Sequence, residues 1–132
     1  MKTVMTCLLL CLLIFSILSA ACLTSTKKDR IQKAIPGTYI RFSEHEFGRV
    51  WDTLTIQKLT SELAVFQILH KWNYERILDG QRIQPEYKRQ TSLAIYDEDE
   101  HILKDTETGD VYIFDIKNNT VFAGETIYKK IN

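Results

Sequence analysis

The chain has 132 residues and carries 17 Lys and Arg residues against 17 Asp and Glu residues, so it fits one domain with a short appendage. Because these charges balance, no net field draws the chain to nucleic acid, and we expect no nucleic-acid partner. Hydrophobic residues make up 45% of the sequence, a composition typical of a folded chain rather than a disordered one.

The first 21 residues have the layout of a secretory signal peptide. Lys2 gives a positive start, residues 4–18 carry no charge, and a run of small residues follows at 19–21. This uncharged run is shorter than the ~20 apolar residues that a membrane-spanning helix needs. We therefore expect residues 1–21 to be a cleaved lipoprotein signal peptide, with an uncleaved anchor reaching Leu23 as an alternative.

Cys22 is the predicted site of lipid attachment. Residues 18–22, Leu-Ser-Ala-Ala-Cys, resemble a bacterial lipobox, in which the cysteine is acylated and becomes the first residue of the mature protein. The match is relaxed, because Ser19 stands where the usual motif has a large aliphatic residue. Acylation also explains a lone thiol in an oxidising compartment, since Cys7 and Cys11 are removed with the signal peptide. Several acyl chains, palmitate among them, hold a protein far more firmly than one chain does.

This anchor predicts a protein of the cell envelope, held at the outer membrane and facing the periplasm or the surface. Ordinary cleavage after Ala21, followed by free secretion, is the alternative. Residues 22–36 then form a polar tether, and the spacing of its apolar residues allows a short helix before Pro36.

Residues 37–132 have the pattern of a β domain, because apolar and polar residues alternate with a period of two. The clearest run is residues 66–74, in which Phe, Ile, His, Trp and Tyr occupy every second position. We expect such positions to form a packed interior rather than a roomy cavity. The expected core side chains are Ile40, Phe42, Leu54, Ile56, Phe66, Ile68, Trp72, Tyr112, Phe114, Phe122 and Ile127.

Turn residues divide this domain into seven or eight short strands. Asp79-Gly80 lies between two strand-like runs and is the strongest short-range signal of a β-hairpin, and Asn118-Asn119 separates two later runs. Short strands joined by tight turns form an antiparallel meander, which tends to close because an open edge invites aggregation. The predicted fold class is therefore all-β, an antiparallel meander closed into a small barrel, with a β-sandwich as the alternative.

The hairpin at Asp79-Gly80 also predicts a register. Leu78 lies opposite Gln81, and counting outward brings Trp72 opposite Tyr87 and His70 opposite Arg89. Pro85 cannot donate a ladder hydrogen bond, so we expect a bulge or a sheet edge there, which leaves the register beyond it open.

Several short segments of the sequence carry a resemblance to a known family. They are Gly-Thr-Tyr at 37–39, Asp-Thr-Leu-Thr-Ile at 52–56, Lys-Trp-Asn-Tyr-Glu-Arg at 71–76, Leu-Asp-Gly at 78–80, Pro-Glu-Tyr-Lys at 85–88 and Tyr-Lys-Lys at 128–130. Residues 37–131 thereby resemble the small lipocalin-like lipoproteins of Bacteroidota. The resemblance implies a barrel and residence in the envelope, and it implies no activity. The chain lacks the Gly-x-Trp start and the disulfides of true lipocalins, so no ligand pocket is carried over.

We expect no enzyme, because the chain has no phosphate-binding glycine loop, no Gly-x-Ser-x-Gly elbow and no His-Glu-x-x-His helix. No cofactor is expected either. The three histidines, His45, His70 and His101, fall on different predicted elements, so a shared metal site is not expected. The acidic run 97–100 lacks the spacing and the glycine of a calcium loop and is predicted to be a solvated turn.

One stretch has the composition of a recognition patch. Aromatic rings with polar tips beside guanidinium groups can bind a sugar, a peptide or an anionic headgroup. The alternative is that the aromatic residues belong to the core near a barrel mouth. The candidate patch consists of His70, Trp72, Tyr74 and Arg76 on one strand face, with Tyr87 and Arg89 alongside.

The expected function is therefore that of a membrane-anchored binding or accessory module. Its partners would be the membrane, through the lipid on Cys22, and a protein or a small apolar or sugar ligand. The alternative is a structural component of an envelope machine, in secretion or conjugation.

Overall fold

In the computed structural model the described residues are 30–60 and 63–132. The predicted signal peptide, Cys22 and the first part of the tether lie outside them. The chain divides into two units, residues 1–31 and 32–132, and the fold described below is that of the second. A short helix covers residues 30–34, and none of the helices in the described ranges is long and apolar enough to cross a membrane.

Nine strands follow the helix in chain order. They are β1 (Gly37–His45), β2 (Gly48–Lys58), β3 (Val65–Leu78), β4 (Gln81–Arg82), β5 (Glu86–Asp97), β6 (Ile102–Asp105), β7 (Val111–Asp115), β8 (Thr120–Ala123) and β9 (Thr126–Lys130).

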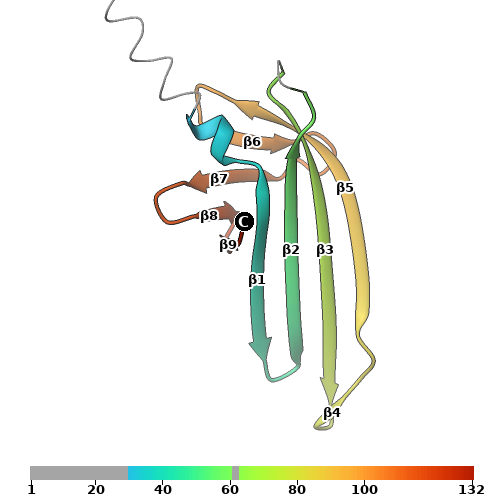
Figure 1. Ribbon diagram of the computed structural model, residues 1–132. Coiled ribbons are helices and arrows are strands. Elements are labelled where there is room, and N and C mark those ends of the chain that lie inside the picture. The colour runs from blue at the N-terminus through green and yellow to red at the C-terminus, as the bar shows by residue number, and fades with distance from the viewer. Residues whose placement is uncertain (1–29, 61–62) are drawn as a thin grey trace, which may run out of the picture. The chain divides into compact units, whose positions relative to one another are not determined.

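The strands form a closed barrel. All strand pairs among the described residues are antiparallel, and β1 closes the ring by pairing with β9 on one side and with β2 on the other. Eight strands take part, because β4 only extends the hairpin that begins at β3. This confirms the predicted all-β antiparallel meander and is consistent with a lipocalin-like barrel (Figure 1). Because the ring of strands is closed, the structure excludes the alternative, a β-sandwich.

Apolar and tyrosine side chains that alternate along the strands occupy the barrel interior. Burying this apolar surface is the main term that stabilises a domain of this size. Where tyrosines are buried, the structure supplies partners for their hydroxyls: Tyr39 donates to the Ile35 carbonyl oxygen at 2.7 Å. The most deeply buried apolar residues are Ile35, Tyr39, Leu54, Ile56, Phe66, Ile68, Ala94, Tyr96, Leu103, Tyr112, Val121 and Tyr128.

The predicted core is correct for Leu54 and Ile56 of β2, for Phe66 and Ile68 of β3 and for Tyr112 of β7, and it is wrong for β1 and β9. Ile40 and Phe42 are 41% and 54% exposed, and Ile127 is 53% exposed, because these residues point outward. Tyr39 and Tyr128 point inward in their place, each with a hydrogen-bonded hydroxyl. When both faces of a strand carry large rings or aliphatic chains, the sequence shows the alternation clearly, but it does not show which of the two sets of side chains faces the interior.

Three other predicted core residues are also less buried than expected. Trp72, Phe114 and Phe122 are half-buried rather than buried. Phe122 pairs with Ile127, so it lies on the outer face, and Val121 is the inward residue of β8. The interior is therefore built with more tyrosine and less phenylalanine than the sequence pattern predicted.

The strands are of very unequal length. β1, β2, β3 and β5 have 9, 11, 14 and 12 residues, whereas β6 to β9 have 4 or 5. β9 pairs only with Tyr39 and Ile40 of β1, and β6 pairs only with residues 94–97 of β5. The long strands therefore continue past the barrel as an open four-stranded sheet, as Figure 1 shows. We call this part, residues 41–45, 48–53, 70–76 and 86–91, the sheet extension.

Candidate functional site

The two faces of the sheet extension have different origins. One face continues the barrel interior, because side chains on a strand alternate strictly between the two sides of the sheet. His70, Trp72, Tyr74 and Arg76 of β3 all lie on this inner face, in phase with the buried Phe66. The other face continues the outer wall of the barrel. The structure therefore brings four of the six predicted patch residues together.

A hydrogen-bonded trio lies where the barrel interior meets the inner face. Asp52 is buried, and its Oδ1 lies 2.5 Å from His70 Nε2, while its Oδ2 accepts a hydrogen bond from the Tyr128 hydroxyl at 2.8 Å. Burial, together with this hydrogen bond to Asp52, raises the pKa of Tyr128 above its ordinary value of 10.0. The hydroxyl therefore remains a donor throughout the physiological range.

Next to this trio the inner face is hollowed, with a volume of about 300 Å³. The Trp72 ring packs against the His70 ring with centroids 4.4 Å apart, and the Arg76 guanidinium lies 5.8 Å from the centroid of the Tyr74 ring. Arg76 also pairs with Glu86 at 3.4 Å. We call this the inner hollow, and its lining residues are Val50, Trp72, Tyr74, Arg76, Glu86 and Lys88.

The remaining two patch residues, Tyr87 and Arg89, lie on the opposite face. Trp72 pairs with Lys88 rather than Tyr87, and His70 pairs with Gln90 rather than Arg89. The predicted register is therefore wrong by one residue in this part of β5.

The cause of this shift is a bulge. Asp79 and Gly80 both have positive φ, and Leu78 pairs with Gln81 as predicted. Further on, Ile77 pairs with Arg82 but Tyr74 pairs with Glu86, so three residues, 83–85, face two, 75–76. The extra residue falls next to Pro85, which confirms the bulge expected there and moves every following side chain to the other face.

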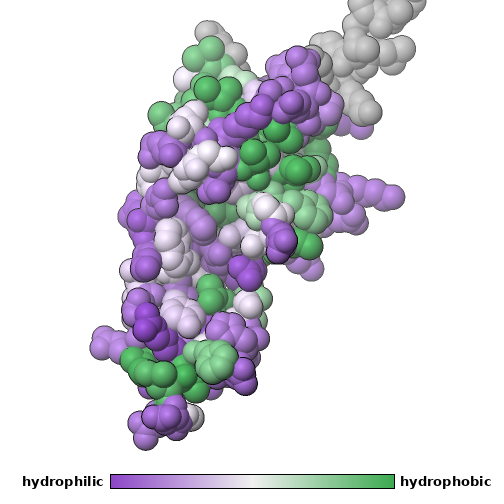
Figure 2. Space-filling model, turned by 180° about the vertical axis from the view of Figure 1, so that it is seen from behind, coloured by the Kyte–Doolittle hydropathy of each residue, from purple (hydrophilic) through white to green (hydrophobic). Residues whose placement is uncertain are grey.

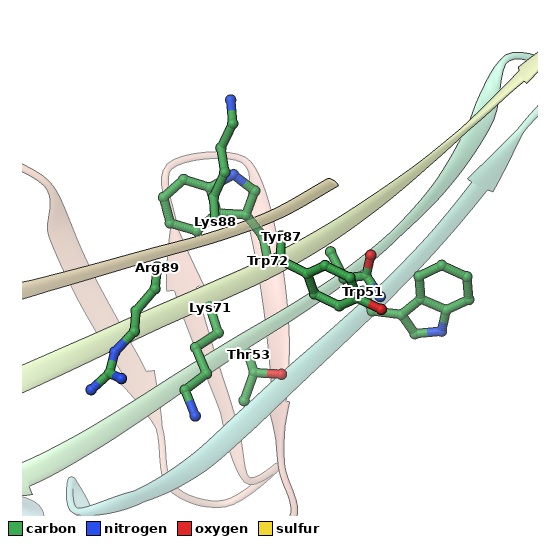
Figure 3. A pocket seen from close by; sticks show the side chains of 8 residues that line it. Trp51, Thr53, Lys71, Trp72, Tyr87, Lys88 and Arg89 are labelled. Atoms are coloured by element: carbon green, nitrogen blue, oxygen red, sulfur yellow. The ribbon is translucent and has the colours of Figure 1, made fainter. Parts of the chain in front are cut away.

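The outer face of the sheet extension has its own hollow, of about 270 Å³, shown in Figure 3. In that view Lys71 and Arg89 extend from one side of the sheet, and Trp72 and Lys88 extend from the other. We call this the outer hollow; the outward-facing residues that line it are Trp51, Thr53, Lys71, Asn73, Tyr87 and Arg89.

Four residues of the inner face were not predicted, namely Val50, Asp52, Glu86 and Lys88. Asp52 stands two residues before Leu54 and so shares its inward phase. The alternation along β2 could therefore have predicted that Asp52 lies on the inner face. The position of Lys88 on the inner face could not be predicted in this way, because it depends on the bulge at residues 83–85.

The histidines do not converge. His45 ends β1, His70 lies in β3, and His101 lies in the turn between β5 and β6. Within residues 30–60 and 63–132, no three His, Cys, Asp or Glu side chains are grouped so as to hold a metal ion.

The acidic run 97–100 is a self-contained turn. Asp97 accepts hydrogen bonds from the backbone N–H groups of Asp99 and Glu100, and Lys104 binds it at 3.1 Å. The hydrogen bond from Glu100 N–H and the contact with Lys104 hold the pKa of Asp97 below its ordinary value. The carboxylate oxygens of Asp97 are thus already engaged within the turn.

The chain matches no protein-family model, no curated protein and no solved structure. No relative therefore assigns a role to either hollow.

Proposed function

We propose that this protein is a small binding module of the cell envelope and that it holds its ligand in the inner hollow. The observation that carries the proposal is the continuation of the interior face beyond the barrel. Trp72 and Tyr74 occupy inward positions of β3, yet no opposing wall from β6 to β9 covers them. Large aromatic surface left open in a concave site is the usual basis of ligand binding.

The chemistry of the inner hollow indicates a ligand with an apolar body and an electronegative group. The rings of Trp72 and Tyr74 offer apolar contact, while Arg76 and Lys88 bring two positive charges against the one carboxylate of Glu86, which pairs with Arg76. Asp52 contacts both His70 and Tyr128 through its carboxylate. It thereby fixes the His70 ring, against which Trp72 packs. A wall fixed in this way loses little conformational entropy when a ligand binds.

A titration with anilinonaphthalene sulfonate, which joins apolar rings to an anion, tests this proposal. We expect Trp72→Ala and Arg76→Ala each to weaken binding by about tenfold, or about 1.4 kcal/mol. Ile113→Ala, which removes an exposed apolar side chain from the barrel wall, is the matched control and should leave binding unchanged. Equal binding by all four proteins would exclude the inner hollow as the site.

The second part of the proposal concerns location. We propose that lipid on Cys22 tethers the module to the outer membrane, facing the periplasm or the surface, as in the small lipocalin-like lipoproteins of Bacteroidota. Support comes from the uncharged run at 4–18 and from the lone cysteine that follows it. Intact mass of the native protein should begin at Cys22 and include acyl chains, and Cys22→Ser should release the protein from membranes. A mass that includes Met1 would contradict this part.

A structural role in a secretion or conjugation machine is the second candidate function. Figure 2 shows apolar surface gathered at the free end of the long strands. Phe47, Leu78 and Ile83 are exposed there, and Ile77 N–H donates to the Phe47 carbonyl at 2.9 Å, which joins the two hairpins. If this candidate is correct, cross-linking in membranes should join the protein to a large complex, and Leu78→Asp should abolish the cross-links. Ile113→Asp is the control.

A further inference from the structure

Two parallel rows of side chains cross the outer hollow. In the first row Thr53 pairs with Lys71, and Lys71 pairs with Arg89. In the second row Trp51 pairs with Asn73, and Asn73 pairs with Tyr87. The rows are two residues apart along each strand, a spacing of about 7 Å. One row is therefore cationic and the other aromatic, with an amide at its centre.

The cationic row has an uncompensated charge. Lys71 and Arg89 are direct cross-strand neighbours, and like charges in such a pair repel each other. Neither forms an ion pair within the described ranges. The acids on this face, Glu44 and Glu75, both lie opposite Arg49 at the far end of the sheet extension. The free protein thus holds two cations together, and the acids of their face lie beside Arg49 instead of beside them, which is the electrostatic signature of an anion site.

The aromatic row contains an unsatisfied acceptor. Asn73 Oδ1 is buried and has no hydrogen-bond donor among the described residues. Buried acceptors without a partner are rare because they forgo hydrogen bonds to water. Asn73 lies between Trp51 and Tyr87 in this row and lines the outer hollow, and Tyr87 is 76% exposed. The structure thus offers an anion site and a hydrogen-bond acceptor within one hollow.

We propose that the outer hollow binds an anionic saccharide. The acidic group of the sugar binds Lys71 and Arg89, a sugar hydroxyl donates to Asn73 Oδ1, and the C–H face of the ring packs on Tyr87 or Trp51. The 7 Å spacing of the rows suits one sugar ring with its acidic substituent. A hollow of about 270 Å³ suits a ligand of one or two such rings.

The geometry favours a sugar over a nucleotide, although a nucleotide also joins an anion to a ring. Trp51 and Tyr87 lie on the same face of the sheet, one on each side of Asn73, so together they cover only one face of a bound ring. The uncovered face stays in water. This suits a saccharide, which has hydroxyl groups to hydrate, better than a nucleobase, whose apolar faces gain from being covered on both sides.

Calorimetric titration of the full chain in detergent with digalacturonate, an acidic disaccharide, tests this proposal. We expect a Kd of about 1 mM or tighter at low salt, weakened at least about tenfold in Arg89→Ala and in Lys71→Ala. Maltose, a neutral disaccharide, should bind at least about tenfold more weakly than digalacturonate. Lys129→Ala, which removes an exposed cation from β9, is the matched control and should bind like the parent protein.

A second readout separates a binding role from a structural one. Removing either cation relieves the repulsion between Lys71 and Arg89, so the Tm of Lys71→Ala should equal or exceed that of the parent protein while its affinity falls. Anilinonaphthalene sulfonate binding at the inner hollow should be unchanged in Arg89→Ala, so each proposal can fail without the other.

Three results would overturn the saccharide site. They are equal affinity for digalacturonate and maltose, no binding of digalacturonate at about 10 mM, and tighter binding of adenosine monophosphate than of digalacturonate. An affinity loss in Arg89→Ala that is matched in Lys129→Ala would show general charge attraction instead of a site.

Discussion

The sheet extension is built from four of the eight strands of the barrel, yet its side chains have different surroundings from those in the barrel. Along β3, Phe66 and Ile68 are buried because short strands close the ring opposite them. A few residues further on, the same face of the same strand carries Trp72 and Tyr74 with no wall opposite. The lengths of β6 to β9 thus decide where the core ends and where a site can begin. The division between core and site follows from topology more than from residue type.

The largest expected effect tests whether stability resides in the closed part. Phe66→Ala should reduce the free energy of unfolding by about 3–5 kcal/mol, because Phe66 is fully buried and its loss leaves a cavity. Phe42→Ala, in the sheet extension, should have a much smaller effect, because Phe42 is more than half exposed. Urea denaturation of both variants measures the difference. Similar losses would mean that the extension carries as much stability as the barrel.

A smaller effect is expected at the boundary between the two regions. Asp52→Ala should destabilise the protein by about 1–3 kcal/mol, since it leaves the buried Tyr128 hydroxyl without its acceptor. The same change frees His70, so binding to the inner hollow should weaken as well. Tyr128→Phe is the control, because it removes the buried donor together with its need for a partner and leaves Asp52 beside His70. A stability loss in Asp52→Ala without weaker binding would show that the trio serves the barrel alone.

The smallest expected effect is a pH dependence confined to the barrel. Burial alone would raise the pKa of Asp105, but hydrogen bonds from the Ser92 hydroxyl and from two backbone N–H groups outweigh it, so this pKa lies below its ordinary value of 3.8. A depressed pKa stabilises the folded state above the ordinary value, and this contribution is lost as the pH falls through the depressed one.

Asp105→Asn removes that contribution, so the parent protein should be the more stable of the two at neutral pH. The gap in unfolding free energy should narrow between about pH 5 and about pH 2. Denaturation series at several pH values measure it, and ligand binding to the extension should be the same in both proteins at neutral pH. A gap that stays constant with pH would contradict the low pKa.

Much of the fold could be predicted because its signals are local. The alternation along residues 66–74 and the turn at Asp79-Gly80 each depend on a few neighbouring residues, and both are present in the structure. The phase of β1 could not be predicted in the same way. Tyr39 is buried, and its hydroxyl reaches the Ile35 carbonyl, a contact that the alternation pattern does not contain.

The candidate site was predictable only as far as β3. His70, Trp72, Tyr74 and Arg76 share a face because strand geometry alone requires it. The neighbours contributed by β5 depend on the number of residues in the bulge, and a single proline in that loop does not fix the number. The existence of an open extension depends on where β6 and β9 stop, which is a property of the whole barrel.

The bulge at residues 83–85 decides which side chains each hollow receives. Deleting one of its three residues would slide β5 by a single position, so that Tyr87 and Arg89 would join Trp72 on the concave side while Lys88 left it. The presence of one residue in this loop thus determines on which of the two opposite faces the aromatic and cationic side chains of β5 lie. Insertions and deletions at this point offer the chain a route to new ligand preferences while the packed end of the molecule stays as it is.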